Sequence, residues 1–244
     1  MKDDNKVDEL ITAIPGEWKF DAQVVAKFDE HVSKSVPLYY EFQSMIVEMS
    51  EWFIRDNSVV FDIGSSTGET ISQLIKKHER KVNLKFVGVD NSNSMIEAAN
   101  IKCPQENVEF ILDDVTTMET FPKADFIVSL YTLQFLRLAE RRKLLEKVYE
   151  TLPEGGAFIL VEKIKAEHSF LDDIWRELNW DYKSKQGLSD EMILQKARSL
   201  RGVLIPLTLT QNKELLIQIG FSEVDVFAKQ FNFAGIIAVK PIKT

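Results

Sequence analysis

The fold that we expect is decided by one stretch of sequence, VVFDIGSSTGETISQLI, which runs from Val59 to Ile75. Its apolar start predicts a buried strand over 59–63, and the spacing of its later apolar residues predicts a helix over 69–78. Gly64 and Gly68 lie in the turn between them, where glycine allows tight backbone geometry and the close approach of a ligand. An ordinary strand-to-helix turn needs fewer special residues. This turn is therefore a candidate binding site.

Strands and helices alternate on both sides of this turn. We expect further strands over 84–90, 108–114, near 126–130, 157–164, 223–229 and 231–240, and helices over 38–55, 92–101, 139–152, 170–200 and 210–221. The first helix has an apolar stripe, which predicts that these residues face a core: Phe42, Met45, Ile46, Met49, Trp52 and Phe53. The pattern predicts an α/β, Rossmann-like, doubly wound and mostly parallel seven-stranded sheet. Its last strand should be antiparallel, because the final two strands form a hairpin.

Composition limits the classes of function. The chain of 244 residues has a net charge of −8, which argues against direct nucleic-acid binding, where a basic face is expected. Its one cysteine, Cys103, fits a reducing cytoplasm. No apolar run approaches the ~20 residues that span a bilayer, and the first ten residues show no signal-peptide core, so we expect a cytoplasmic protein without membrane contact. His31, His78 and His168 have no metal-ligand spacing, so we expect no metal site.

Carboxylates follow three of the predicted strands. Asp62 ends the first strand, Asp90 ends the second, and Asp114 follows the third, so all three should face one crevice at the carboxyl ends of the sheet. Asp90 can accept hydrogen bonds from two ribose hydroxyls, or it can cap the next helix. Asp114 can accept from an adenine amine. Ser66 occupies the place of the second glycine of a pyrophosphate-binding turn, and no Walker loop is present, so the pattern favours an adenosine ligand without phosphates.

Several motifs together resemble the class I S-adenosylmethionine-dependent methyltransferases: DIGSSTG, GVDNSNSMI, DDV, TLQFL and LPEGGAFIL. Longer stretches are similar to one branch of that class, the carboxy-S-adenosylmethionine synthase family: KFDAQVVAKFDEHVSKSVPLYYEFQSMI, YTLQFL, LVEKI and FNFAGIIAVK. In that family a methyltransferase fold makes a carboxylated cofactor from S-adenosylmethionine and prephenate, for tRNA uridine modification. The resemblance covers the chain from about Trp18 onward. It implies an N-terminal helical cap over 1–55 and a cofactor-binding domain over 56–244, with a helical insertion over about 168–205.

The resemblance also implies roles for individual residues. Tyr39 would contact S-adenosylmethionine from the cap, and Gly64, Ser65 and Ser66 would hold its amino-acid part. The ribose and adenine would be held by Asp90, Asn91, Asp114 and Val115. Asp62 and Gly68 complete the expected cofactor site because they belong to the turn itself. A homodimer is implied as well, and the aromatic-rich stretch 171–182 offers apolar area for it.

Two positions depart from the family pattern. Leu130 stands where the family has an asparagine, and Ala197 stands where it has an arginine that receives the carboxylate of the carboxylated cofactor. Arg198 is adjacent, but one residue along a helix turns a side chain by about 100°. We therefore expect ordinary methyl transfer to a small-molecule nucleophile. The alternatives are a carboxy-S-adenosylmethionine synthase and, in a different class, a non-catalytic S-adenosylmethionine-binding regulatory protein.

Candidates for the substrate side follow the fourth and fifth strands. Gln134, Glu162 and Arg198 are expected to line it, and Tyr131 and His168 are the candidates for a catalytic role. Each has a plainer alternative in packing, local hydrogen bonding or solvation. Methyl transfer needs a general base only where the nucleophile must lose a proton, so the sequence names no definite catalytic residue.

Overall fold

The computed structural model describes residue 25 and residues 28–243, so most of the expected cap before residue 28 lies outside the described residues. The strands are β1 (Val59–Ile63), β2 (Lys85–Asp90), β3 (Val108–Leu112), β4 (Phe126–Leu130), β5 (Ala157–Lys163), β6 (Glu223–Gln230) and β7 (Phe233–Val239). The helices are α2 (Phe28–Ser35), α3 (Tyr39–Met49), α4 (Glu69–Lys77), α5 (Asn93–Lys102), α6 (Leu138–Thr151), α7 (Ser169–Lys185), α8 (Asp190–Ser199) and α9 (Leu209–Ile219). Two 3₁₀ turns, η2 (Ser50–Trp52) and η3 (Leu133–Phe135), complete the described elements.

These strands form one sheet in the order β3-β2-β1-β4-β5-β7-β6, which confirms the predicted fold. Strands β1 to β5 pair in parallel, and β7 lies antiparallel between β5 and β6. The strand order reverses between β1 and β4. In open sheets of this kind, ligands bind at the carboxyl ends of the strands beside such a reversal. The turn after β1 lies at that place.

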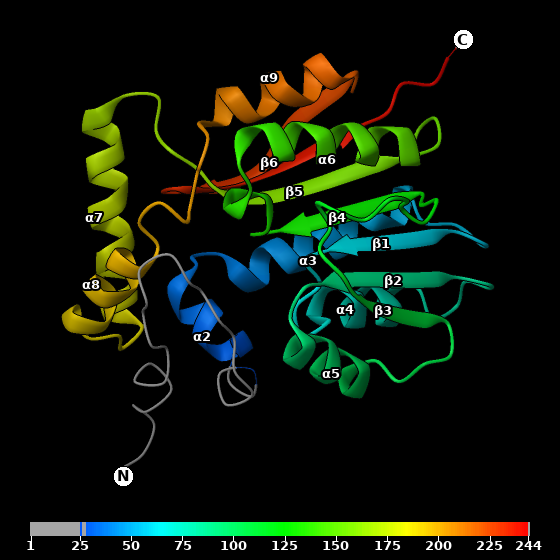
Figure 1. The fold of residues 1–244 in the computed structure, drawn as a ribbon, viewed down its shortest axis with the longest axis horizontal. Coiled ribbons are helices and arrows are strands. Elements are labelled where there is room, and N and C mark those ends of the chain that lie inside the picture. Colours follow the sequence, from blue (N-terminus) through cyan, green and yellow to red (C-terminus); the bar gives the residue numbers. More distant parts are fainter. Residues whose placement is uncertain (1–24, 26–27, 244) are drawn as a thin grey trace.

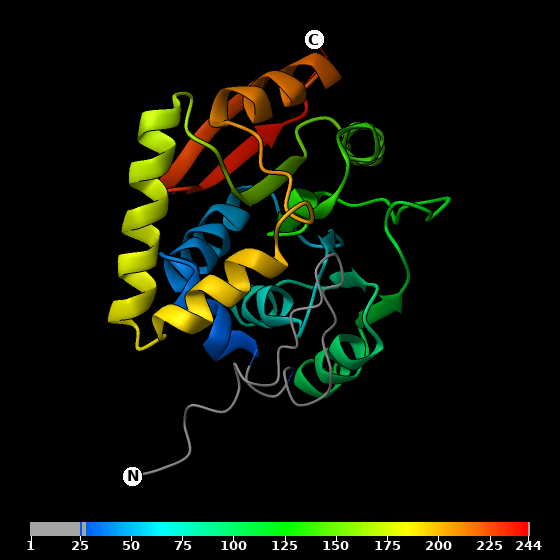
Figure 2. The same ribbon diagram turned by 60° about the vertical axis from the view of Figure 1, so that its left-hand side comes forward.

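Helices cover both faces of the sheet (Figures 1 and 2). One core contains buried residues of α6 and α9, among them Leu144, Val148 and Leu216. The core on the other face contains residues of α3 and α4, among them Phe42 and Leu74. Helices α2, α7 and α8 stand beyond the carboxyl ends of the central strands, on the left in Figure 1, and so border the expected site.

The predicted helix over 38–55 is shorter than its apolar stripe suggested. Phe42 and Ile46 are fully buried, as expected, but α3 ends at Met49 and the chain tightens into η2. Because a 3₁₀ turn advances each residue by a larger angle than an α-helix, the stripe is not continued. Trp52, which was expected in the core, is 74% exposed, and Met45 is 36% exposed.

The helical stretch expected over 170–200 consists of two helices. Gly187 has a φ of +89°, a conformation that glycine adopts without strain, and it ends the first helix. Ser189 then caps α8, because its side chain accepts a hydrogen bond from the N–H of Met192. This break turns the chain, so that α7 and α8 both face the carboxyl edge of the sheet (Figure 2).

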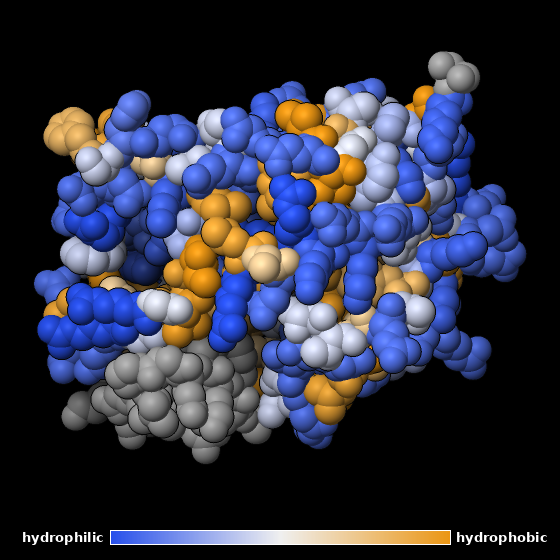
Figure 3. Space-filling model, turned by 45° about the horizontal axis from the view of Figure 1, so that its top comes forward, coloured by the Kyte–Doolittle hydropathy of each residue, from blue (hydrophilic) through white to orange (hydrophobic). Residues whose placement is uncertain are grey.

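Polar side chains dominate the surface face drawn in Figure 3, where apolar residues form separate patches. Among the described residues, no helix is long and apolar enough to cross a membrane.

Candidate functional site

The turn after β1 is shaped by two glycines with different tasks. Gly64 has a φ of +75°, and a Cβ there would lie 2.0 Å from Oγ1 of Thr132. Only glycine lets the segment after β4 pack against this turn. Gly68 also has a φ of +75°, and a Cβ there would lie 2.9 Å from the ring of Phe110. Gly68 does not line the pocket, so it permits packing at the start of α4.

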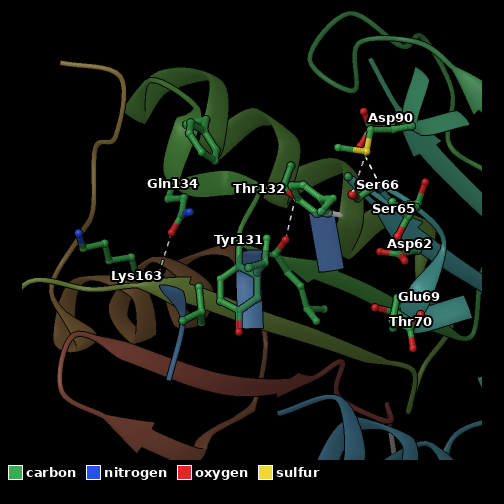
Figure 4. Close-up of a pocket in the computed structure, with 18 of the residues that line it drawn as sticks. Asp62, Ser65, Ser66, Glu69, Thr70, Asp90, Tyr131, Thr132, Gln134 and Lys163 are labelled. Atoms are coloured by element: carbon green, nitrogen blue, oxygen red, sulfur yellow. Dashed lines mark hydrogen bonds between the residues drawn. The ribbon is translucent and has the colours of Figure 1, made fainter. Parts of the chain in front are cut away.

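A pocket of about 500 Å³ lies above this turn, at the carboxyl ends of β1, β2 and β4. Nine of the ten expected cofactor residues line it: Tyr39, Asp62, Gly64, Ser65, Ser66, Asp90, Asn91, Asp114 and Val115. Figure 4 shows Gln134 and Lys163 on one side of the pocket, Asp62, Ser65 and Ser66 on the other, and Tyr131 and Thr132 between them. The volume lies within the range of small-molecule sites.

The structure bears on one of the two roles that the sequence left open for Asp90, the one at the start of the next helix. Its Oδ1 accepts a hydrogen bond from the N–H of Ser92, 2.9 Å away, at the start of α5, so it does fix the next helix. Its Oδ2 accepts from the N–H of Ser66, 3.0 Å away, in the glycine turn. The carboxylate therefore ties β2 to the turn after β1 while lining the pocket. Burial raises its pKa, and the N–H groups of Ser92 and Ser66 oppose that effect.

Asp62 and Ser65 are buried polar residues in the wall of the pocket. Burial raises the pKa of Asp62 to about 8, and the nearby charge of Asp90 adds to the effect. Oγ of Ser65 is buried and makes no hydrogen bond within the described part of the chain. Unsatisfied buried polar groups are costly, and both of these line the pocket. They fit the ammonium and carboxylate groups of an amino acid, so the residues present suit the amino-acid part of S-adenosylmethionine.

The far end of the pocket suits the base of a nucleoside. Asp114 accepts hydrogen bonds through Oδ1 from the N–H and the hydroxyl of Thr116, at 2.8 and 2.7 Å. These bonds fix the side chain of Asp114 and occupy only one of its carboxylate oxygens. Val115 is buried beside it and offers an apolar surface to a planar ring.

Aromatic side chains form the wall between the turn and the helical insertion. Tyr131 has a φ of +59°, which is strained for a residue with a side chain and costs on the order of 1–3 kcal/mol. Its ring stacks on that of Tyr39, with centroids 6.2 Å apart, and meets Phe233 edge-on at 6.1 Å. The Tyr131 hydroxyl is buried without a hydrogen-bond partner in the described chain, and burial raises its pKa. Such a strained, polar position facing a cavity is typical of a functional site.

Gln134 and Glu162 lie at different depths. Gln134 lines the pocket, and its Oε1 accepts a hydrogen bond from the N–H of Lys163 at 2.8 Å. Glu162 does not line the pocket. Its carboxyl group is buried below the backbone of η3, where burial raises its pKa to about 8 although the charge of Arg141 lowers it. Both carboxyl oxygens of Glu162 are without a hydrogen-bond partner among the described residues, so it is a buried, unsatisfied group behind the wall of the pocket.

Besides Glu162, the catalytic candidate His168 and the expected substrate-side residue Arg198 stand outside the pocket. His168 is exposed at the start of α7, and Arg198 is exposed on α8. Neither lines the cavity. Lys196, two residues earlier on α8, lines the pocket, and two residues of an α-helix turn a side chain by about 200°, so Arg198 lies on another face of the helix.

Three lysines of the pocket were missed in the sequence. Lys163 ends β5, Lys183 lies on α7, and Lys196 lies on α8, and all three line the cavity. Lys163 directly follows Glu162 and is the last residue of β5. Its position at a strand end could have identified it as a pocket residue. Nothing in the spacing of the other two indicates that a bend at Gly187 brings them together.

Helix α2 is fastened over the pocket from both sides. Asp29 accepts a hydrogen bond from Oγ1 of Thr67 at 2.9 Å and forms an ion pair with Lys102 at 2.6 Å; Lys102 also pairs with Glu69 at 2.8 Å. On the insertion side, the hydroxyl of Tyr182 donates to the carbonyl of Ser33 at 3.0 Å. The described part of the cap therefore closes one side of the site.

Comparison with known proteins places this geometry in a family. The model of a family described as "Methyltransferase domain" matches residues 60–156. A carboxy-S-adenosyl-L-methionine synthase of Staphylococcus epidermidis is 40% identical over 227 residues, which cover 93% of this chain and 98% of that protein. The protein of the same name from Nautilia profundicola is 37% identical over 93% of this chain and 96% of its own length. The chain belongs to the carboxy-S-adenosyl-L-methionine synthase family.

Solved structures agree with the fold of this family. Human N-acetylserotonin methyltransferase, in complex with S-adenosylmethionine, superposes with a TM-score of 0.61 at 17% identity, covering 91% of this chain and 57% of that one. Phosphoethanolamine N-methyltransferase 2 of Haemonchus contortus superposes with a TM-score of 0.64 at 15% identity, covering 91% and 58%. As a member of the carboxy-S-adenosyl-L-methionine synthase family, the chain is an enzyme of the S-adenosylmethionine-dependent methyltransferase class, with S-adenosylmethionine as its cofactor. Among the described residues, no group of three or more histidine, cysteine, aspartate or glutamate side chains could hold a metal ion.

Proposed function

We propose that this protein is a carboxy-S-adenosyl-L-methionine synthase that uses prephenate as the source of the carboxylate. The observation that carries the proposal is the likeness to a synthase at 40% identity over 98% of the relative's length. The expectation of ordinary methyl transfer rested on Ala197, which removes the family's cation. Because Lys163, Lys183 and Lys196 line the same pocket, that reason no longer holds.

The reaction balances without a further reactant. Prephenate loses its ring carboxylate as carbon dioxide and its ring hydroxyl as hydroxide, and becomes the aromatic product phenylpyruvate. The methyl group of S-adenosylmethionine loses one proton to that hydroxide, which gives water, and gains a carbon–carbon bond to the carbon dioxide. The C–H electron pair becomes the new C–C bond, so no redox partner is needed.

The chain's own residues have three tasks in this reaction. Asp90 and Asp114 would hold the ribose and the adenine, and Asp62 with Ser65 would hold the amino-acid part; Tyr131 and Gln134 line the same pocket. The aromatic wall and the fastened α2 exclude water from the space beside the methyl group. Exclusion of water retains the carbon dioxide and the hydroxide where they form, and so favours their capture.

The test is a single incubation of the purified protein with S-adenosylmethionine and prephenate, in which the ring carboxylate carries ¹³C. The expected result is carboxy-S-adenosylmethionine that carries the label, detected by mass spectrometry, together with one equivalent of phenylpyruvate. The control omits prephenate. Absence of the labelled product, with S-adenosylmethionine bound, would overturn the proposal.

Ordinary methyl transfer to a small-molecule nucleophile remains the second candidate, and Leu130 favours it. This residue lines the pocket with an apolar side chain where the resemblance implies an asparagine. In this case the assay would form S-adenosylhomocysteine with a suitable acceptor and no carboxylated product. A non-catalytic regulatory protein would form neither product.

We also propose that the protein is a homodimer that acts in the cytoplasm on a small-molecule substrate, without direct contact with nucleic acid. Phe170 and Leu171 at the start of α7 are 74% and 37% exposed, which supports a contact between two copies. Sedimentation at micromolar concentration tests the dimer, and a Phe170→Ser variant is expected to shift the equilibrium toward monomer.

A further inference from the structure

The described residues that line the pocket form two walls of different charge. Those with a carboxylate all precede residue 115 and belong to α2, α4 or the ends of β1, β2 and β3: Asp29, Asp62, Glu69, Asp90, Asp113 and Asp114. The described lining residues from position 130 onward include no aspartate or glutamate. The first wall therefore supplies acceptors for the hydroxyl and amino groups of the cofactor, and the second wall has room for an anion.

Gln134 is a polar side chain of the second wall that is held from two directions. It lies in η3, is 6% exposed and lines the pocket. Its backbone carbonyl accepts a hydrogen bond from the N–H of Ile205 at 2.8 Å, and the carbonyl of Ile205 accepts from Nη2 of Arg141 at 2.8 Å. Its side-chain Oε1 accepts from the N–H of Lys163 at 2.8 Å. Both the main chain and the side chain of Gln134 are therefore fixed.

The bond to Lys163 determines which way round the amide of Gln134 lies. A backbone N–H can only donate, so the amide atom that faces it must be the oxygen. Figure 4 shows this oxygen on the dashed line to Lys163 and the amide nitrogen on the other branch, turned away from that line. Nε2 makes no hydrogen bond within the described part of the chain, and it is not among the buried polar atoms, so it is open to the pocket. Two N–H donors of fixed direction are therefore left for a ligand.

The acceptor that suits these donors is a carboxylate of the co-substrate. The cofactor's own carboxylate is expected at the glycine turn, and Figure 4 shows Ser65 and Ser66 of that turn on the opposite side of the pocket from Gln134. The sulfonium of the cofactor has no acceptor to offer. A neutral amide can bind an anion without leaving a buried charge in the empty site, and hydrogen bonds to charged groups are the stronger ones.

We propose that Nε2 of Gln134 donates a hydrogen bond to a carboxylate of the co-substrate, and so orients the co-substrate on the wall opposite the glycine turn. This inference rests on the proposed function, because it assigns a residue to the co-substrate of that reaction. Gln134 is then a specificity-determining residue. A site that presents donors of fixed direction selects an anionic acceptor, and it rejects a ligand that leaves these donors unpaired.

The experiment measures the affinity for prephenate by calorimetry at pH 8, with the protein saturated with S-adenosylhomocysteine so that no turnover occurs. Gln134→Glu keeps an oxygen for the N–H of Lys163 but places a charged oxygen where the nitrogen was. We expect prephenate to bind at least about ten-fold more weakly, because a bond to a charged acceptor is replaced by repulsion. The affinity for S-adenosylmethionine should stay equal or increase, since its sulfonium is positive. A merely structural defect would weaken both ligands, and unchanged binding of prephenate would overturn the inference.

Gln211→Glu is the matched control. Oε1 of Gln211 likewise accepts a backbone N–H, that of Thr208 at 3.0 Å, and Gln211 does not line the pocket. The same chemical change in the same kind of hydrogen bond should alter neither affinity. An equal loss of prephenate binding in Gln211→Glu would overturn the inference, because the loss would then come from net charge. Gln134→Met, which lacks both the donors and the added charge, should also weaken prephenate, and urea unfolding checks that it folds.

The same variants separate this inference from the proposed function. A wild type that binds prephenate but forms no carboxylated product contradicts the proposed function, and the affinities of the variants still decide the role of Gln134. A wild type that forms the product, with the same KM for prephenate in Gln134→Glu, contradicts only the role of Gln134. The expected result is a rise of at least about ten-fold in that KM for Gln134→Glu and no change for Gln211→Glu. A wild type that does not bind prephenate overturns the inference.

Discussion

Replacement of Asp90 by alanine should separate cofactor binding from folding, because we assign this carboxylate to the cofactor and it also bonds to the backbone. It accepts the N–H groups of Ser66 and Ser92 at 3.0 and 2.9 Å, and it lines the pocket where the ribose is expected. Two ribose hydroxyl bonds to a charged acceptor are each worth about 1.5–3 kcal/mol. Their loss corresponds to about 3–6 kcal/mol, and therefore to a rise in Kd of at least ~100-fold at the lower limit.

The assay is calorimetric titration with S-adenosylmethionine, accompanied by urea unfolding of each variant. Asp125→Ala is the matched control. Asp125 is similarly half-buried, its Oδ2 accepts the N–H of Val59 at 2.8 Å, and it lies at the opposite end of the sheet. Both variants should lose about 1–3 kcal/mol of stability for the backbone N–H groups left without a partner. Only Asp90→Ala should lose affinity. Wild-type affinity in Asp90→Ala, or an equal loss in both variants, would refute the assignment of Asp90 to the cofactor.

Three further predictions concern folding and the closure of the site. Gly64→Ala should abolish cofactor binding and lower the free energy of unfolding by more than about 2 kcal/mol, because its Cβ would lie 2.0 Å from Thr132. The control is Gly202→Ala, where φ is +74° and no atom lies within 4 Å of the new Cβ. It should lower the free energy of unfolding, measured in urea, by about 1 kcal/mol. Lys102→Met should destabilise the protein by about 1–3 kcal/mol and weaken cofactor binding several-fold, because it leaves the carboxylates of Asp29 and Glu69 without their shared cation. Lys34→Met, which breaks the exposed pair with Glu30, should change neither the stability nor the affinity. Glu162→Gln should flatten the pH dependence of stability. The folded protein holds a proton on Glu162 up to about pH 8, whereas the unfolded chain releases it at lower pH. Wild-type stability should therefore fall by up to about 1.4 kcal/mol per pH unit between pH 5 and 8. The same slope in Glu162→Gln would contradict this.

The fold was predictable because its strands are short apolar runs and its helices have regular apolar spacing. The βα alternation fixes a parallel sheet, and the final hairpin fixes the antiparallel strand, as the pairing of β7 with β5 and β6 confirms. The local exceptions depend on tertiary geometry. Trp52 is exposed and not in the core because α3 gives way to a 3₁₀ turn, which has fewer residues per turn than an α-helix. A pattern of apolar residues alone does not indicate that change.

The cofactor side of the site was predictable for a related reason. Asp62, Asp90 and Asp114 follow three parallel strands, and the carboxyl ends of such strands must meet at one edge of the sheet. The sequence left open whether Asp90 serves the start of a helix or a ligand, since both require the same residue at the same position. The opposite wall of the pocket comes from η3, α7 and α8, whose placement depends on the bend at Gly187 and on packing against α2.

The position of Ala197 shows what a comparison by sequence position leaves out. An arginine binds a carboxylate through two parallel N–H bonds, so its loss from one position removes a specific geometry. A lysine contributes mainly a charge, and charges from different elements act together at one point in a pocket. Lys163, Lys183 and Lys196 are far apart in the sequence, and each alone reads as an ordinary solvated residue. In the structure all three line the same pocket. Recognition by summed charge tolerates a moved ligand carboxylate better than a bidentate arginine does, so the pocket should accept the carboxylates of two different molecules, the co-substrate before the reaction and the carboxylated cofactor after it.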